Sequence, residues 1–346
     1  MLSSLPIDSY TLTYACSVLL CALLGFFALP ECCDKMLRKK HAQITGAFDR
    51  QLAAYKEFEA NPASVDAATE SRVTKWARDM ARMESIGKVE PRMAVKLAEA
   101  GIIAEARPAE EYVNVPEEMW KLDATPKSRT VCGLALTALG ALMTLPWLIH
   151  PAPAAICAPV CVALLFVAVL AVACDVRAKV IPYQLCALAA IPSAALMLLS
   201  NNPDGYLPCA LSALIATLGL WGFSKLGQLF GIKGAIGMGD IRLLPWICLP
   251  LGANGTAYGL FFCFALMFIW SISVIIRQKA SKDTARAKLE HIKENKAGYA
   301  MAFVADPLGK KNGKGKRNTY LAMGPGLALW LAAGFACAYL APPFWL

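Results

Sequence analysis

The stretch GIKGAIGMGDIRLL, residues 231–244, lies between long apolar segments. It contains four glycines, the bases Lys233 and Arg242, and one acid, Asp240. The apolar runs on either side have lengths that suit a lipid bilayer, whose hydrocarbon core needs about 20 helical residues. A carboxylate in such a place is costly, so Asp240 is a candidate functional residue.

Apolar runs of this kind recur along the whole chain. Of the 346 residues, 57% are hydrophobic, compared with roughly 45–50% in soluble domains. The pattern predicts an all-α, polytopic membrane helix bundle of about eight transmembrane spans, the sixth being too short to cross a bilayer alone. The expected spans lie near 10–30, 130–149, 154–174, 183–200, 208–224, 241–252, 257–276 and 320–340.

The basic residues predict the orientation of these spans, because Lys and Arg concentrate in cytoplasmic loops. All 34 Lys and Arg residues fall on one side of the membrane in this arrangement. We therefore expect a multi-pass protein of the inner (cytoplasmic) membrane with both termini outside. The loops account for the net charge of +9, so the expected partner is the lipid bilayer and no nucleic acid is expected.

The expected spans and their orientation divide the chain into three parts. Residues 1–30 are expected to form an uncleaved transmembrane anchor rather than a signal peptide, because basic residues follow the apolar run at once. Residues 31–129 are expected to form a small helical cytosolic domain, which either gathers substrate or shapes the membrane domain. Residues 130–346 are expected to form the membrane domain, with a basic cytosolic loop at 277–319 facing lipid headgroups.

Local signals predict three helices in the cytosolic domain, over 34–60, 64–83 and 91–100. The last has Pro91 at its start and Gly101 just past its end, which are usual start and stop signals. An alternating-charge helix is also expected at the start of the 277–319 loop.

Neither a metal nor a cofactor is expected. Most of the thirteen cysteines fall inside the spans, where Cys behaves as a small apolar residue. No CxxC pair occurs, and the adjacent Cys32 and Cys33 do not match the spacing of zinc ligands. The basic tract GKKNGKGKRN in the 277–319 loop lacks the spacing of a phosphate-binding loop.

Three acids occur between residues 130 and 276: Asp175, Asp204 and Asp240. Asp204 belongs to the outer turn NNPDGY, whose turn chemistry accounts for it. Asp175 ends the third span and Asp240 begins the sixth, so both are expected at the cytoplasmic boundary. Two carboxylates a few ångströms apart share one proton, and the pair can then activate water and donate to a carbonyl oxygen. This is the chemistry of aspartic peptidases.

Around these acids the sequence resembles the type IV prepilin peptidases, GxGD-type membrane aspartic peptidases related to the preflagellin peptidases. Asp175 is followed seven residues later by Pro182, as in the family's first motif. Residues 237–240, GMGD, match the second motif with Gly237 and Gly239, and Arg242 stands where Lys is usual. The resemblance covers about 130–340 and extends to Leu251-Gly252 and to the Gly-Pro of LAMGPGLALW at 321–330.

The resemblance implies that Asp175 and Asp240 are the catalytic pair. It also implies a substrate: type IV pilin-like precursors with a short basic leader, cut on the cytoplasmic side just before their hydrophobic helix. Lys233 is a candidate supporting residue, although Gly234 follows it where the family commonly has an acid, and Tyr183 stands where Asn or Asp is usual. Because the paired CxxC motifs of many methylating members are absent, we predict the peptidase and not the N-methyltransferase.

Other functions remain open at this point. A proton-coupled membrane transporter also uses acids in broken helices, although both acids here are expected at one surface and no internal repeat is present. A presenilin-like intramembrane protease shares the GxGD element, but the spacing to Pro182 and the base after Asp240 favour the prepilin branch. Retention of both acids disfavours a non-catalytic assembly factor.

Overall fold

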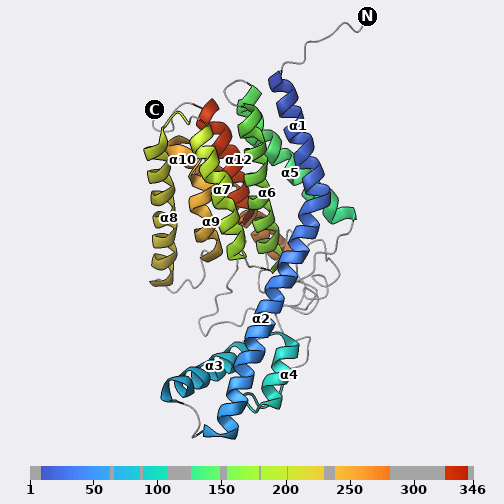
Figure 1. The fold of residues 1–346 in the computed structure, drawn as a ribbon, viewed down its shortest axis with the longest axis vertical. Helices are drawn as coiled ribbons and strands as arrows, with labels where there is room; N and C mark the ends of the chain where they lie inside the picture. The colour runs from blue at the N-terminus through green and yellow to red at the C-terminus, as the bar shows by residue number, and fades with distance from the viewer. Residues whose placement is uncertain are drawn as a thin grey trace, which may run out of the picture. The chain divides into compact units, whose positions relative to one another are not determined.

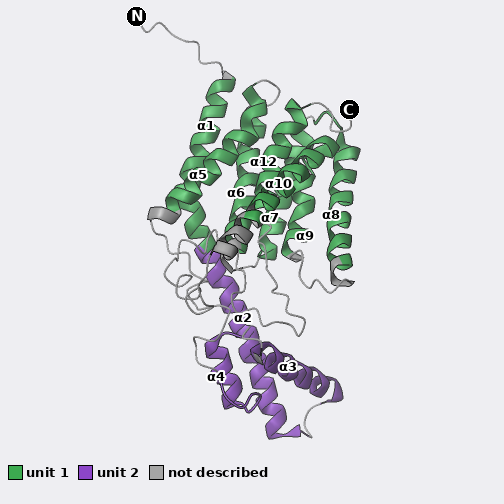
Figure 2. Cartoon of the chain, turned by 180° about the vertical axis from the view of Figure 1, so that it is seen from behind, with its two compact units in different colours: residues 1–33, 123–305, 319–346 green, residues 34–122, 306–318 purple. Residues whose placement is uncertain are grey.

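The computed structural model describes residues 9–62, 66–85, 89–106, 126–148, 154–178, 181–200, 202–229, 238–280 and 324–341. These residues are predominantly helical and include no strand, which confirms the all-α class. The chain divides into two compact units, coloured differently in Figure 2. Unit 1 comprises residues 1–33, 123–305 and 319–346, and unit 2 comprises residues 34–122 and 306–318.

The helices of unit 1 lie side by side as a bundle (Figure 1). Each predicted span corresponds to one of them. They are α1 (Ser9–Leu23) with the π-helical η1 (Leu24–Ala28), α5 (Pro126–Thr144) with the 3-10 segment η5 (Leu145–Leu148), α6 (Ala154–Ala178), α7 (Tyr183–Leu199), α8 (Tyr206–Leu229), α9 (Met238–Cys248), α10 (Gly252–Ala280) and α12 (Gly324–Leu340). The helix α2 (Leu29–Ala60) continues from η1, and the boundary between the units falls inside it.

Among the residues that the structure describes, five helical segments are long and apolar enough to cross a membrane, which indicates a membrane protein. They are Tyr10–Ala60, Arg129–Leu148, Ile156–Asp175, Tyr206–Leu226 and Gly252–Ile269. The apolar helices α7 and α12 are shorter, at 17 residues each. With 11 residues, α9 rises only about 16 Å, so it is too short to cross alone, as the sequence predicts. The full set of eight spans stays a prediction.

The centre of unit 1 is formed by α6 and α12. Helix α6 packs against α1, α5, α7 and α12, and α12 also packs against α5, α9 and α10. Because α6 is apolar on all sides, it can be surrounded by other helices. Its fully buried side chains include Cys157, Cys161, Leu164, Leu165 and Cys174.

Glycines let α10 and α12 approach closely, as small residues do in membrane helix pairs. A Cβ on Gly255 would lie 2.6 Å from the carbonyl oxygen of Gly334, and one on Gly326 would lie 2.7 Å from Sγ of Cys263. A Cβ on Gly259 would overlap the ring of Trp330. The Gly-Pro segment noted in the sequence therefore begins a helix that packs tightly on α10.

Helix α1 ends in the wider, π-helical turn η1. Glycines let this end of the helix pack closely on α5. In η1 the N–H of Leu29 donates to the carbonyl of Leu24, five residues earlier. This wider turn lies directly before Pro30, which has no N–H and whose ring crowds the preceding turn of a regular helix. A Cβ on Gly25 would lie 2.8 Å from Cα of Gly133, so this end of α1 lies directly against α5.

The turn before α8 is tied to the turn before α10. The Asn202 side chain donates to the carbonyl of Pro250 at 3.0 Å, and an Asp204 oxygen accepts the N–H of Asn254 at 3.0 Å. Gly205 has a φ of 79°, as expected for the predicted turn. The sequence predicts that the seventh span starts at 257, whereas α10 begins at Gly252, and Asp204 accepts an N–H that its first turn leaves open.

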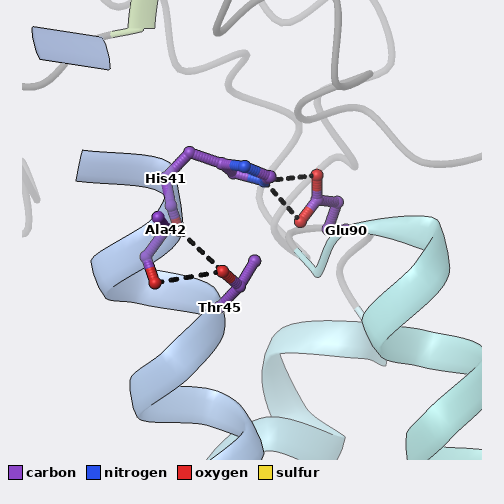
Figure 3. A network of polar contacts seen from close by, with 4 residues as sticks. All are labelled: His41, Ala42, Thr45 and Glu90. Atoms are coloured by element: carbon purple, nitrogen blue, oxygen red, sulfur yellow. Dashed lines mark hydrogen bonds and ion pairs between the residues drawn. The ribbon is translucent and has the colours of Figure 1, made fainter. Parts of the chain in front are cut away.

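Unit 2 contains the three helices that the sequence predicts. They are α2, α3 (Ala67–Ser85) and α4 (Pro91–Glu99). Their core is formed by the buried side chains of Phe48, Leu52, Val89, Ala94 and Leu97, with Trp76 packed against it. His41 of α2 makes a hydrogen bond to Glu90, which caps α4, at 2.9 Å (Figure 3). Most of the predicted 277–319 loop, including its alternating-charge helix, lies outside the described residues.

Candidate functional site

Asp175 lies near the end of α6, which stops at Ala178. Its side chain is half-buried, and the preceding residue, Cys174, is fully buried. The chain then turns into α7, which begins at Tyr183. Since the two helices pack together and are joined by a short link, Asp175 lies beside the starting end of α7.

Pro182 forms the start of α7. It is buried at the N-cap position with a ψ of 132°, and its carbonyl accepts the N–H of Leu185 at 3.0 Å. Proline suits this place because its ring fixes φ near the helical value, while its missing N–H would have no helical partner. The Pro182 of the first motif therefore fixes where α7 begins after Asp175.

Asp240 lies in the first turn of α9 and is only 6% exposed. An acid is favourable there, because the start of a helix carries a partial positive charge. The preceding Gly239 lies against the link between α6 and α7: a Cβ on it would be 2.9 Å from Cβ of Ile181 and 3.3 Å from its Cγ1. The second motif thus contacts the residue directly before Pro182 of the first.

The arrangement of three helices follows from this contact. Helix α7 packs on both α6 and α9. Asp175 near the end of α6 and Asp240 at the start of α9 therefore both belong to the end of α7 where Ile181 lies. The two acids share one end of the bundle, and α7 connects the helices that carry them.

Several residues near Asp240 could not be predicted from the sequence. Its carboxylate interacts electrostatically with the thiols of Cys186 on α7 and Cys263 on α10. Arg242 is exposed and also acts on Cys186. Nothing in the sequence distinguishes these cysteines from others in the spans, and Ile181 carries no signal beyond being the apolar residue before Pro182.

The structure describes one of the two glycines of the second motif. Gly239 lies within α9, and its missing side chain allows close packing on Ile181. Gly237 and Lys233 lie outside the described residues. Tyr183 is 62% exposed.

The two acids have unlike environments, since one carboxyl is buried and the other is half-exposed. Such asymmetry suits a pair in which one carboxyl acts as the acid and the other as the base. Within the described part of the chain, no group of three or more His, Cys, Asp or Glu side chains is placed to hold a metal ion. Comparison of the chain with protein-family models, curated proteins and solved structures finds no match.

Proposed function

We propose that the chain is a membrane aspartic endopeptidase that removes the short basic leader of type IV pilin-like precursors. The observation that carries this proposal is the contact between Gly239 and Ile181. It joins the GxGD segment of Asp240 to the start of α7, directly after the helix that carries Asp175. Two acids from distant parts of the sequence thereby belong to one end of the bundle.

The proposed chemistry uses one proton shared by Asp175 and Asp240. The ionised carboxyl takes a proton from a water molecule, which attacks the carbonyl carbon of the scissile peptide bond, while the protonated carboxyl donates to the carbonyl oxygen. The tetrahedral intermediate then breaks its C–N bond as a carboxyl returns a proton to the leaving amine. No metal and no covalent intermediate are required.

The substrate class rests on the resemblance and on where the acids lie along their helices. A precursor whose hydrophobic helix enters the bilayer presents the bond before that helix at the membrane boundary. Acids at helix ends suit cleavage at such a boundary better than cleavage at the bilayer midplane. We therefore propose a site that faces the cytoplasm at the inner membrane; the absence of CxxC motifs gives no support for N-methylation.

The test is co-expression of the full chain with a type IV pilin precursor, followed on gels by the shift from precursor to mature pilin. Asp175→Asn and Asp240→Asn should each abolish this shift, because Asn neither exchanges the proton nor serves as a base. The amount of each variant in the membrane is measured in parallel.

Asp204→Asn is the matched control. It makes the same substitution at the third acid between residues 130 and 276, and its side-chain oxygen can still accept the N–H of Asn254. Cleavage should persist in this variant. Leader removal by either Asp175→Asn or Asp240→Asn would exclude the proposed pair.

A further inference from the structure

Two buried thiols from distant parts of the chain are in contact next to the proposed site. Sγ of Cys33 lies 3.7 Å from Sγ of Cys174, and the two residues are 141 positions apart. Both side chains are fully buried. Cys33 belongs to α2, and Cys174 belongs to α6, immediately before Asp175.

The packing of unit 1 holds this pair together. Helix α1 with η1, which continues into α2, packs against α5 through Gly25 and Gly133, and α1 also packs against α6. Cys132 of α5 interacts electrostatically with Cys33, so it is the alternative thiol with which Cys33 could form a disulfide. Cys32 is half-buried, unlike Cys33.

We propose that Cys33 and Cys174 form a reversible disulfide that acts as a redox switch. Because a disulfide has an S–S length of about 2.0 Å, the sulfurs must approach by roughly 1.7 Å from their present 3.7 Å. On the proposed cytoplasmic side of the membrane, disulfides are usually transient and redox-sensing, which fits a pair held as thiols in contact.

The oxidant in this proposal is a small peroxide. One thiolate attacks hydrogen peroxide, which gives a sulfenic acid and, after proton transfer, water. The second thiol then displaces the hydroxyl group of the sulfenic acid, which forms the disulfide and releases a second water. Both cysteines lose one hydrogen and the peroxide is reduced, so the reaction is balanced; a dithiol reductant reverses it.

The consequence for activity rests on the proposed function. A bond at Cys174 ties the end of α6 to α2 and moves the backbone that carries Asp175. Displacement of a catalytic group by about 1 Å can lower a rate ~100-fold. We expect oxidation to slow leader removal by roughly tenfold or more, and reduction to restore it.

The bond itself is detected without any activity assay. A cleavage site for a specific protease is inserted between residues 107 and 125 of the full chain, which puts Cys33 and Cys174 on different fragments. After peroxide treatment, blocking of the remaining thiols and cleavage, the fragments should stay joined on a non-reducing gel and separate after reduction.

Cysteine-to-serine variants identify the pair. Cys33→Ser and Cys174→Ser should each let the fragments separate after oxidation. Cys132→Ser and Cys32→Ser are the controls and should leave them joined. Separation in the oxidised parent protein, or loss of the link in Cys132→Ser, would overturn the proposed bond.

Leader removal is then measured in the oxidised and reduced proteins. Oxidation should slow it in the parent and leave it unchanged in Cys33→Ser, which lacks one of the two thiols that form the bond. A disulfide that forms without changing the cleavage rate would refute the switch. If the disulfide forms but no leader is removed under any condition, the peptidase proposal fails while the bond stands.

Discussion

Gly239 has no room for a side chain, because the start of α9 lies directly against Ile181. In an isolated helix, Ala in place of Gly would favour folding by about 1 kcal/mol. The contact reverses this preference, since a methyl group would meet Cβ, Cγ1 and Cδ1 of Ile181 within 3.4 Å. Either α9 or the α6–α7 link must move to accept it, and each of them adjoins one of the two acids.

We therefore predict that Gly239→Ala lowers the rate of leader removal by roughly tenfold or more, with little loss of protein from the membrane. Gly219→Ala on α8 is the control, because nothing lies within 4 Å of the place that its Cβ would occupy. Adding Ile181→Gly to Gly239→Ala removes the overlapping atoms and should restore part of the rate. Parent-level cleavage by Gly239→Ala would show that the contact does not position the site.

Helix α10 begins where a distant acid fixes its first turn. Asp204 accepts the N–H of Asn254, and Gly252 lies against both Asp204 and Asn202 with a φ of 66°. At this φ a residue other than glycine costs roughly 1–2 kcal/mol. A side chain at 252 would also overlap Oδ2 of Asp204 and disturb the cap, whose loss costs a further ~0.5–2 kcal/mol.

Gly252→Ala should therefore lower the midpoint of thermal unfolding of the detergent-purified protein more than Gly205→Ala does. Gly205 has a similar φ of 79°, but nothing lies within 4 Å of its Cβ position, so it carries only the backbone cost. Asp204→Ala removes the overlapping oxygen. The double variant Asp204→Ala/Gly252→Ala should therefore lower the midpoint by less than the sum of the decreases in the two single variants. Equal midpoints for the two glycine variants would rule out the steric part of this account.

The helix boundaries show which elements can be predicted from the sequence. The signals of α4 are local, since Pro91 begins the helix and Gly101, with a φ of 70°, follows its end. The apolar pattern predicts the start of α10 at 257, whereas the helix begins at 252, because its cap is Asp204, which is distant in sequence. Local patterns carry no information about such a partner.

The same distinction applies to the candidate site. The two acids can be found from the sequence because a carboxylate near lipid is costly and rare. Ile181 cannot be found in this way, since an apolar residue beside a span is ordinary. The contact of Cys33 with Cys174 cannot be predicted from the sequence either, because a cysteine in a span resembles any other small apolar residue there. The distance between the two thiols depends on how α2 and α6 pack.

At the scale of the whole of unit 1, hydrogen bonds show which parts of the chain lie at the same end of the bundle. The side chain of Asn202 donates to Pro250, so the end of α9 reaches the same end as the turn between α7 and α8. The hydroxyl of Tyr339 donates to the carbonyl of Ser200 at 3.2 Å, so the end of α12 lies there too. The short α9 therefore reaches this end although it rises only about 16 Å.

The basic residues predict the orientation of the bundle, and reporters at three positions test it. Because of these contacts, the results at two of the positions depend on each other. A reporter inserted at residue 203 and one fused after residue 346 should both be located outside the cytoplasm. A reporter inserted between residues 281 and 319, a segment that is rich in Lys and Arg, should be inside. Alkaline phosphatase, which is active outside, and a fluorescent protein that folds in the cytoplasm give opposite readouts at each position.

The first two positions must agree with each other whichever way the bundle is oriented, because Ser200 and Tyr339 are in contact. Disagreement between them would contradict the packing of the end of α12 on the end of α7. Agreement with both inside would preserve the fold but reverse the membrane orientation, and it would place the end of α7 that adjoins Asp175 and Asp240 outside. The proposed cytoplasmic cleavage requires both reporters outside, so this measurement tests the fold and the location of the chemistry separately.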